Sequence, residues 1–350
     1  MIYYDITKMG SARHRSGLVR LTSRLMEELG SAITPVVWDE RQRTFVTGRQ
    51  RASVKWERKD WLFTVEMFSE SERPGISAFL KNPPCRLAAM FHDAIPLRFP
   101  HITWPQSVQR HPEYMKLLAG FERTWAISEE TKKDFTGFWR WQGVEVRAQV
   151  DVIELGADFD GGTRVQRDPL VAPGRPVLLC VGIVEPRKNQ PFLLDIGEGL
   201  WREKVDFELA VVGRINPHFG KSIAARMKAL EKREPRFRFH AAAGDRELAR
   251  LYANARAVAF PTIAEGCGLP LLEALWRGVP CVASDLPVLR ENADGGGCLM
   301  AGVNDADDWR MKLRSVLTDG DISRRLQREA MARALPRWTD AAQTILKALR

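Results

Sequence analysis

Short apolar runs alternate with amphipathic helical patterns along most of this chain, and the alternation stops once and then restarts. The runs predicted as strands in the first half are Met1–Ile6, Ile33–Trp38, Leu87–Phe91, Thr124–Ile127 and Val150–Leu155. Those in the second half are Pro176–Val184, Val205–Val212, Arg236–His240, Ala255–Phe260 and Val279–Ala283. Strands that alternate with helices are typical of an α/β protein with parallel sheets.

Helical patterns fill the gaps between these runs. The first helix is expected to start near Ser16 and to end at Gly30. Its apolar stripe, at steps of three and four that bury one face, is Leu18, Leu21, Leu25 and Leu29. In the second half we expect helices near residues 190–201, 218–233, 246–254 and 269–277.

The interruption between the two halves is a linker rich in proline and glycine. It contains Asp160-Gly-Gly-Thr163, Pro169, Pro173-Gly174 and Pro176. A length of 350 residues also fits two domains. We therefore predict two doubly wound domains, residues 1–160 and 175–335, that face each other across a cleft. In such sheets ligands bind beyond the carboxyl ends of the strands.

The net charge of +9 has two explanations: a nucleic acid or an anionic membrane surface, or a small ligand that bears phosphate. The basic residues are dispersed rather than gathered into one tract, so nucleic acid is not an expected partner. Five scattered cysteines without a C-x-x-C pair argue against disulfides and a zinc site, and a reducing compartment is expected. No uncharged run is long enough to cross a bilayer, and the start does not read as a signal peptide.

The motif with the most chemical content is Pro261-Thr-Ile-Ala-Glu265-Gly-Cys-Gly268-Leu-Pro-Leu-Leu-Glu273. It joins a buried strand to a helix. Gly266 and Gly268 let backbone N–H groups approach a ligand, and the helix start favours an anion such as phosphate. Glu265 and Glu273 are suited to accept hydrogen bonds from the hydroxyl groups of a sugar or ribose. The alternative is an ordinary tight loop with a solvated Glu273.

Three further motifs follow apolar strands or precede a helix. Val181-Gly182-Ile-Val-Glu185-Pro-Arg187-Lys188-Asn189 places Arg187 and Lys188 where they can hold a diphosphate, or where they are merely solvated bases. Phe91-His92-Asp93-Ala-Ile-Pro96 offers a histidine at a strand end, or a structural His–Asp pair. A single glycine, Gly17, precedes the first long helix and fits a phosphate loop or a simple turn.

Two other patterns have both a functional and a structural explanation. Asp158-Phe-Asp160 is a D-x-D triplet of the kind that can hold a metal, but it runs straight into the linker and is better explained as a solvated domain exit. We therefore expect no metal site. A spread of tryptophan and arginine either docks a lipid-linked acceptor at a membrane surface or forms a mixed domain edge. Its members are Trp38, Arg41, Arg43, Trp56, Arg58 and Trp61.

These motifs together resemble glycosyltransferase family 4, the retaining nucleotide-sugar transferases of GT-B fold. Glu265-Gly-Cys-Gly-Leu-Pro-Leu-Leu-Glu273 is similar to the E-G-F-G-L-P-x-x-E signature of the family, and residues 181–189 resemble its V-G-x-x-x-P-R-K-N stretch. His92-Asp93-Ala-Ile-Pro96 resembles H-D-x-x-P. The resemblance covers nearly the whole chain and implies two Rossmann-like domains. It also implies that the last helix, residues 338–350, crosses back onto the first domain.

The resemblance implies a role for each matching position. Glu265 would bond hydroxyls of the donor sugar and Glu273 the ribose, while Lys188 and Arg187 would neutralise the diphosphate. Backbone contacts to sugar and diphosphate would come from Gly266, Cys267, Gly268 and Leu269. His92 would face the donor sugar as a second catalytic residue, and Gly17 would let its loop approach the phosphates. Two departures stand out: Cys267 replaces an aromatic residue, and Ile183 replaces an arginine, which gives Arg187 more of the phosphate binding.

The expected function is therefore retaining, metal-independent transfer of a hexose from a nucleoside diphosphate sugar, UDP-glucose or GDP-mannose, to an acceptor hydroxyl. The acceptor would be a sugar, a lipid-linked sugar or another hydroxyl compound in bacterial polysaccharide or glycolipid synthesis. The donor is a co-substrate, so no cofactor is expected. We expect a cytoplasmic protein, with peripheral contact at the inner face of the membrane as an option. The alternatives are a nucleotide-sugar epimerase of the same fold and a non-catalytic sugar-nucleotide-binding protein.

Overall fold

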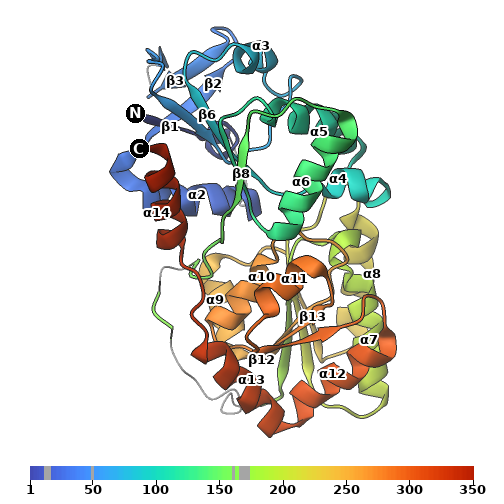
Figure 1. Cartoon of the computed structure of the whole chain (residues 1–350). Helices are drawn as coiled ribbons and strands as arrows, with labels where there is room; N and C mark the ends of the chain where they lie inside the picture. Colours follow the sequence, from blue (N-terminus) through green and yellow to red (C-terminus); the bar gives the residue numbers. More distant parts are fainter. Residues whose placement is uncertain (12–16, 49–50, 160–161, 165–173) are drawn as a thin grey trace. The chain divides into compact units, whose positions relative to one another are not determined.

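The computed structural model describes residues 1–11, 17–48, 51–159, 162–164 and 174–350 (Figure 1). The chain divides into two compact units, each described here by itself. The first unit consists of Met1–Phe159 together with Pro336–Arg350, and the second is Asp160–Leu335. Most of the predicted linker, including Asp160, Pro169 and Pro173, lies outside the described residues, as does Ser16 at the predicted start of the first helix.

The first unit is built on an eight-stranded sheet. Its strands are β1 (Ile2–Asp5), β2 (Thr34–Asp39), β3 (Thr44–Thr47), β4 (Ala52–Ser53), β5 (Trp61–Thr64), β6 (Arg86–Phe91), β7 (Arg123–Ala126) and β8 (Gln149–Val152). They lie in the order β4-β3-β2-β1-β5-β6-β7-β8. The six strands from β2 to β8 in this order are parallel, whereas β3 and β4 extend one edge as an antiparallel meander.

Helices and 3₁₀ turns connect the strands of the first unit. They are α1 (Thr7–Ser11), α2 (Gly17–Leu29), η1 (Gly30–Ala32), α3 (Ile76–Lys81), α4 (Ile95–Arg98), η2 (Pro100–Ile102), α5 (Pro105–Leu118), α6 (Glu129–Gln142) and α14 (Trp338–Leu349). Helix α2 buries three of the four predicted stripe leucines, Leu21, Leu25 and Leu29, and ends before Gly30 as predicted. Strands β3, β4 and β5 were not predicted; β4 has only two residues, too few for a periodic pattern.

The second unit has a six-stranded, fully parallel sheet. Its strands are β9 (Val177–Val181), β10 (Glu208–Val212), β11 (Phe237–His240), β12 (Ala255–Phe260), β13 (Cys281–Ser284) and β14 (Cys298–Ala301). Its helices are η3 (Pro186–Lys188), α7 (Gln190–Arg202), α8 (Gly220–Arg233), α9 (Asp245–Asn254), α10 (Leu269–Trp276), α11 (Pro287–Ala293), α12 (Ala306–Thr318) and α13 (Gly320–Ala332). All five predicted strands and four predicted helices of this half are present; β14 and α11 were not predicted.

The strand order places a ligand-binding position in each unit. The second sheet runs β11-β10-β9-β12-β13-β14, so the direction of chain progression reverses between β9 and β12. In the first sheet the same reversal falls between β1 and β5. Doubly wound sheets bind ligands beyond the carboxyl ends of the strands at this reversal, because the connections on the two sides leave in opposite directions. The predicted fold class, two doubly wound α/β sheets, is confirmed.

The last helix, α14, belongs to the first unit and packs beside α2 (Figure 1). Its first residue, Trp338, is fully buried, and the backbone N–H of Trp338 donates to Oδ1 of the buried Asp158 over 2.8 Å. The Nε of Arg337 donates to the other oxygen of Asp158. A Cβ on Gly156 would lie 2.2 Å from the Trp338 nitrogen. Asp158, the acid of the D-x-D triplet that lies within the described residues, is therefore hydrogen-bonded to the start of α14.

Two observations on the described residues concern membrane contact and cysteine chemistry. None of the described helices combines the length and the apolar character that a membrane-spanning segment needs. Cys85, Cys180, Cys267, Cys281 and Cys298 are all free thiols, and all but Cys298 are buried.

The contact of Gly156 with Trp338 predicts a strong effect of a single methyl group. Gly156→Ala should lower the free energy of unfolding by about 1–3 kcal/mol, because backbone and indole ring both have to move. Gly137→Ala is the matched control: it lies in α6, nothing would touch the new Cβ, and it should stabilise by about 0.5–1 kcal/mol. Melting temperatures measured by calorimetry check both; equal melting temperatures for Gly156→Ala and wild type would contradict the packing of α14.

Candidate functional site

Two loops of the second unit flank the reversal between β9 and β12, and both carry charged side chains. The loop after β9 turns through η3, and Asn189 takes a left-handed conformation (φ 54°) before α7 begins. The loop after β12 leads to α10. The backbone N–H of Ile263 donates to the Arg187 carbonyl over 2.9 Å, so the two loops are joined. The two strongest sequence motifs therefore form one site.

Glu265 is the centre of this site. Its Oε1 accepts three hydrogen bonds: from Lys188 Nζ at 2.5 Å, from Thr262 Oγ1 at 2.7 Å and from Arg187 Nη1 at 3.0 Å. Its side chain is 9% exposed and that of Lys188 is 10% exposed. The other oxygen, Oε2, accepts no hydrogen bond from the described residues. The cations and the carboxylate that the sequence analysis treated as separate ligand contacts thus form an ion pair with each other.

The electrostatics of the pair follow from its burial. Burial opposes the charged form of Glu265, but Lys188 and Arg187 outweigh it and hold the pKa of that carboxyl below its usual range. Burial lowers the pKa of Lys188, against the opposing effect of Glu265. The Lys188 ammonium also lies 4.9 Å from the centre of the Phe260 ring. Lys188 is therefore not a solvated surface base, which excludes that explanation of the motif.

Gly268, the last residue before α10, has a backbone conformation that residues with a side chain rarely adopt. Gly268 has φ 89°, and a Cβ there would lie 2.3 Å from Cδ2 of Leu289. The carbonyl of Cys267 accepts a hydrogen bond from Asn292 Nδ2 on α11. Both Gly266 and Cys267 are buried, so the aromatic side chain usual in the family is not needed to fill this place. Leu269 is the first residue of α10.

Glu273 lies in the second turn of α10 and is only 2% exposed. The alternative of a solvated helix residue is therefore excluded for Glu273. A buried carboxylate is suited to accept hydrogen bonds from hydroxyl groups, since burial without hydrogen bonds is costly for a charged group. Its predicted role toward ribose stays a prediction.

Three residues of this site were missed by the sequence analysis. Thr262 is fully buried and donates to Glu265. Glu185 accepts from Arg187 Nε at 3.0 Å and from Asn216 Nδ2 at 2.9 Å. Thr262 and Glu185 lie inside the motifs, so their position was the available signal. Asn216 lies after β10, and only the tertiary structure brings it to the loop that follows β9.

His92 and Gly17 lie in the first unit. His92 follows β6 and is buried; its Nε2 is 2.6 Å from the carbonyl of Val65, so Nε2 must carry the proton and donate it. Burial lowers the pKa of His92. The next residue, Asp93, accepts a hydrogen bond from the backbone N–H of Ile95, and among the described residues no hydrogen bond joins His92 to Asp93. Gly17 is the first residue of α2, and a Cβ there would touch nothing within 4 Å.

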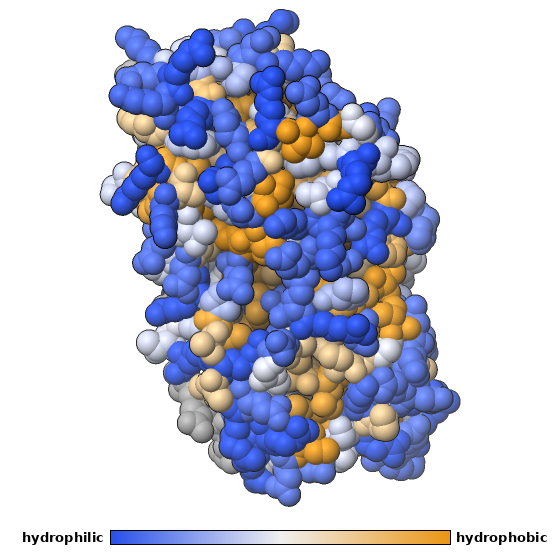
Figure 2. Space-filling model, viewed as in Figure 1, coloured by the Kyte–Doolittle hydropathy of each residue, from blue (hydrophilic) through white to orange (hydrophobic). Residues whose placement is uncertain are grey.

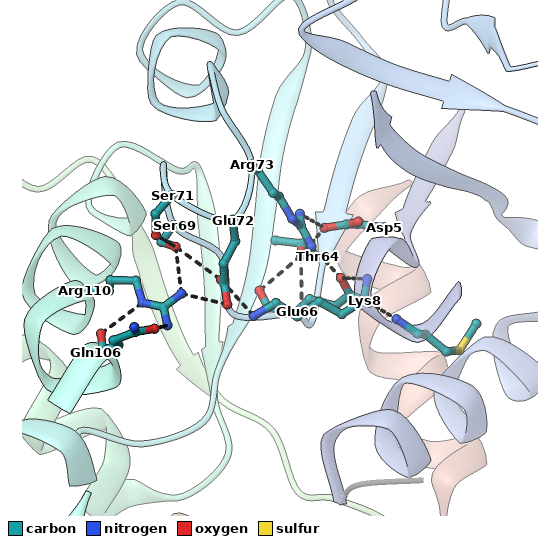
Figure 3. A network of polar contacts seen from close by, with 11 residues as sticks. Asp5, Lys8, Thr64, Glu66, Ser69, Ser71, Glu72, Arg73, Gln106 and Arg110 are labelled. Atoms are coloured by element: carbon teal, nitrogen blue, oxygen red, sulfur yellow. Dashed lines mark hydrogen bonds and ion pairs between the residues drawn. The ribbon is translucent and has the colours of Figure 1, made fainter. Parts of the chain in front are cut away.

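The reversal of the first sheet holds a buried ionic network that the sequence analysis did not find (Figure 3). Arg73 donates to Asp5 at the end of β1 over 2.6 Å and to Glu66 after β5 over 2.5 Å, and all three side chains are 2% exposed or less. Thr64 Oγ1 donates to the same oxygen of Asp5. An acid at the end of each of two apolar strands was the available signal, but Arg73 comes from the following loop and carries no pattern.

Glu66 also holds the start of α1. Its two oxygens accept the backbone N–H groups of Lys8 at 2.7 Å and of Met9 at 2.8 Å. Burial, and next the charge of Asp5, raise the pKa of Glu66 to about 7, against the opposing effect of Arg73. At the rim of the network, Glu72 bridges Lys8 and Arg110 (Figure 3). The connection that follows β1 is thus fixed by a carboxyl that titrates near neutral pH.

Metal binding finds no support in the described part of the chain, where no group of three histidine, cysteine or acidic side chains is placed to hold an ion. Asp158 is committed to α14, and Asp160 lies outside the described residues. The absence of a metal from the reaction stays a prediction.

Comparison with solved structures identifies the fold as GT-B. Sucrose-phosphate synthase from Thermosynechococcus elongatus superposes with a TM-score of 0.74 at 16% identity, over 99% of this chain and 97% of that chain. WaaG, a glycosyltransferase involved in lipopolysaccharide biosynthesis, gives a TM-score of 0.67 at 13% identity, over 100% and 99%. Two doubly wound units of this kind define the class of GT-B proteins.

Sequence comparison then gives the family. Residues 163–333, nearly the whole second unit, match the family of glycosyl transferases group 1. The serotype-specific mannosyltransferase WbdA of Escherichia coli is 30% identical over 230 residues, which are 62% of this chain and 28% of that protein. These matches support a GT-B, family 4-type glycosyltransferase, as the resemblance predicted, and the chain spans a little more than a quarter of the length of WbdA.

Titration of Glu66 predicts a pH dependence of stability in the first unit. The pKa of Glu66 rises from 4.5 to about 7 on folding, so its contribution to stability is fully present below pH 4.5 and is lost as the pH rises through about 7. Relative to Glu66→Gln, wild type should lose about 1–3 kcal/mol across this window.

Hydrogen exchange in β1 and β5, measured at several pH values, gives the free energy of local unfolding for both proteins. Glu145→Gln, at an exposed position of the same unit, is the control and should follow the wild-type curve. Parallel curves for wild type and Glu66→Gln would contradict the raised pKa.

Proposed function

We propose that this chain is a retaining glycosyltransferase that moves a hexose from a nucleoside diphosphate sugar to an acceptor hydroxyl. The observation that carries the proposal is the cluster of Glu265, Lys188 and Arg187 at the reversal of the second sheet, beside the start of α10. Nearly the whole second unit also matches a glycosyltransferase family model. The second unit is then the donor-binding domain and the first unit the acceptor-side domain.

The cluster supplies what a sugar diphosphate requires. Lys188 and Arg187 share one oxygen of Glu265, and Arg187 also pairs with Glu185; a diphosphate offers both cations a stronger set of acceptors. Backbone N–H groups at the start of α10 add a positive dipole end. When a diphosphate takes over the cations, Glu265 is released to accept hydrogen bonds from sugar hydroxyls. Exchange of partners within one ion pair couples the binding of phosphate to the binding of sugar.

The same groups act on the transition state. The bond between the anomeric carbon and the diphosphate oxygen breaks, which builds positive charge on the sugar and negative charge on the leaving group. Lys188, Arg187 and the α10 start stabilise the leaving diphosphate, and such preorganised charge is often the largest catalytic contribution. The negative charge of the Glu265 carboxylate is suited to stabilise the positive charge that develops on the sugar.

Retention of configuration rests on the family resemblance. The acceptor oxygen bonds to the anomeric carbon on the face that the diphosphate leaves, and the acceptor proton passes to a diphosphate oxygen. No side chain between the two is then required as a base. His92, which presents only Nδ1 as a free acceptor, keeps its predicted place toward the donor sugar.

The hexose we favour is mannose, carried as GDP-mannose, because the relative WbdA is named a mannosyltransferase; UDP-glucose is the other donor to test. The acceptor belongs to bacterial polysaccharide or glycolipid synthesis. Transfer needs no metal, since cations and a helix start meet the phosphate charge.

Lys188→Ala tests the donor site directly. It should weaken the binding of GDP, GDP-mannose or UDP-glucose by at least tenfold, because a charge-assisted hydrogen bond contributes about 1.5–3 kcal/mol. Lys228→Ala, which removes an exposed lysine of α8 in the same unit, should bind as wild type does. Titration calorimetry in excess EDTA measures the affinities of wild type and of the two variants. Equal affinity of the Lys188 and Lys228 variants would refute the diphosphate site. Binding restored only by Mn²⁺ would refute metal independence.

Glu265→Gln and Glu273→Gln should affect different kinetic constants. Glu265→Gln should lower kcat by on the order of 10²–10³ while binding of the free nucleoside diphosphate is kept or improved, because Lys188 and Arg187 lose their competing anion. Glu273→Gln should mainly raise the KM for the donor, because ribose is remote from the bond that breaks.

Initial rates with GDP-mannose and any productive acceptor give both constants. Glu265→Gln also leaves Lys188 with a neutral partner, so its melting temperature is measured first and assays are run well below it. Wild-type kcat in Glu265→Gln together with a loss of kcat in Glu273→Gln would show that the two roles are reversed.

A further inference from the structure

The face shown in Figure 2 is covered largely by hydrophilic residues, with hydrophobic patches between them. Ion pairs on such a surface contribute little, because water and salt screen them. The pair of Glu185 and Arg187 in the second unit is different, since Arg187 also contacts Glu265 at the centre of the candidate site. The proposed function gives Glu185 no role, so its place in the site needs an explanation of its own.

The sequence supplies an internal comparison for this pair, because the triplet Glu-Pro-Arg occurs twice in it. One copy is Glu185-Pro-Arg187, in the loop after β9, and the other is Glu234-Pro-Arg236, just before β11. In each copy the arginine Nε donates to the glutamate two residues earlier, over 3.0 Å and 2.7 Å. The glutamate side chains are 15% and 16% exposed. Only the first copy follows a strand of the parallel sheet, at the carboxyl ends where the candidate site lies.

The two copies differ in how the carboxylate is used. Both oxygens of Glu234 accept from Arg236, Oε1 from Nε and Oε2 from Nη2, each over 2.7 Å. In the other copy only Oε1 of Glu185 faces Arg187, whose Nε and Nη2 lie 3.0 Å and 2.9 Å away. The second oxygen of Glu185 accepts instead from Nδ2 of Asn216 over 2.9 Å. Glu234 therefore forms a local pair with its arginine, whereas Glu185 joins its arginine to a residue that follows β10.

Asn216 is held by the turn that precedes α8. Its Oδ1 accepts the backbone N–H groups of His218 at 2.9 Å and of Phe219 at 3.3 Å, so its Nδ2 is the end that faces Glu185. The backbone N–H of Asn216 donates to the Val184 carbonyl over 3.1 Å, which joins the loops after β9 and β10. Glu185 is thus bonded to a partner whose orientation is already fixed by other contacts.

Arg187 has a different kind of partner on each side of its guanidinium. Its Nε and Nη2 face Glu185, whereas its Nη1 donates to Oε1 of Glu265 over 3.0 Å and to the Ala264 carbonyl over 2.8 Å. In the proposed function a diphosphate replaces Glu265 as the partner of Nη1. Glu185 is then the carboxylate that stays with Arg187 throughout, because its second oxygen is bonded to Asn216.

We propose that Glu185 and Asn216 are positioning residues of the donor site, which keep Nη1 of Arg187 aimed at the leaving diphosphate after Glu265 has turned to the sugar. The inference rests on the proposed function, because it requires a diphosphate to take the place of Glu265. A positive group stabilises the charge that develops in the transition state best when its orientation is fixed beforehand. The two hydrogen-bonded contacts of Glu185 supply that fixed orientation.

This role should affect turnover more than affinity. Glu185 competes with the diphosphate for Arg187, so its removal acts on binding in two opposing ways. Loss of orientation weakens the binding of a nucleoside diphosphate, and loss of a nearby negative charge strengthens it. The rate of bond breakage has no such compensation, because it depends on where Nη1 lies as the leaving group gains charge.

Exchange of the acid and the amide between the two positions tests the role of orientation. In Glu185→Gln one end of the side chain is an NH₂ group, so it cannot accept hydrogen bonds from both Arg187 and Asn216. In Asn216→Asp two carboxylates face each other, although Oδ1 can still accept the two N–H groups of the turn. In the double variant the new amide can accept from Arg187 and donate to the new carboxylate. Both hydrogen bonds then return, with the same total charge as in wild type.

Turnover is measured as release of nucleoside diphosphate from GDP-mannose or UDP-glucose, whichever wild type binds more tightly, with water as the acceptor. Glu185→Gln and Asn216→Asp should each lower kcat by about 10- to 100-fold, because a displacement of about 1 Å in a positioned group can cost on the order of 10²-fold. The double variant should recover most of this loss. The Kd of the free nucleoside diphosphate, measured by titration calorimetry, should change little in Glu185→Gln.

The second Glu-Pro-Arg triplet provides the matched control. Glu234→Gln removes a carboxylate of the same sequence context and nearly the same exposure, and it should keep the wild-type kcat. In an Arg187→Ala background Glu185→Gln should have no further effect on kcat, because it acts through Arg187. Melting temperatures are measured for every variant, and the assays are run well below the lowest of them.

Three results would overturn the inference while the proposed function stands. They are a kcat of Glu185→Gln equal to that of Glu234→Gln, the same loss of kcat with and without Arg187, and no recovery in the double variant. Tighter binding of the nucleoside diphosphate with unchanged kcat in Glu185→Gln would show that Glu185 only competes with the ligand, which also overturns it. Failure of wild type to bind either nucleotide sugar would refute the proposed function, and this inference with it.

Discussion

The interaction on which the candidate site depends is the buried hydrogen bonding of one carboxylate oxygen of Glu265 to Lys188, Thr262 and Arg187. It joins the loops after β9 and β12 across the reversal of the second sheet. A buried carboxylate without its cations would be costly, and the buried ammonium of Lys188 would be costly without the carboxylate. Each loop therefore holds the other in place, and the charges of the site are already oriented by their own hydrogen bonds.

The reversal of the first sheet also has buried charges that pair with each other, but there the acids outnumber the cation. There a single buried cation, Arg73, is shared by two carboxylates, Asp5 and Glu66. Two acids close to one cation leave one of them poorly compensated, which is why the pKa of Glu66 rises to about 7. In the second unit Glu265 has two cations beside it, Lys188 and Arg187, and its pKa falls, although Arg187 also pairs with Glu185. Doubly wound topology brings charged strand ends together in both units, and the balance of charge decides what each can bind.

Regular patterns of sufficient length were predictable from the sequence. The five strands expected in the second half are all present, and β12 has the predicted bounds, because its apolar run is bounded by clear breaks at both ends. Strands β5 and β14 were not predicted, although they are no shorter than β7 and β13, which were. The motif residues of the site were found, whereas Asn216 became visible only through its partner Glu185, and Arg73 of the first unit only through Asp5 and Glu66.

By itself, the sequence determined the α/β class, the resemblance to a glycosyltransferase family and the residue types at two strand ends, because these depend on local pattern and spacing. Only the tertiary structure decided that Lys188 and Glu265 are paired, that Asp158 is bonded to the start of α14, and that Trp38 and Trp61 are buried while Trp141 is exposed. The physical reason is that charge pairing and burial depend on residues tens to hundreds of positions away, and a spacing rule along the chain contains no information about such distances.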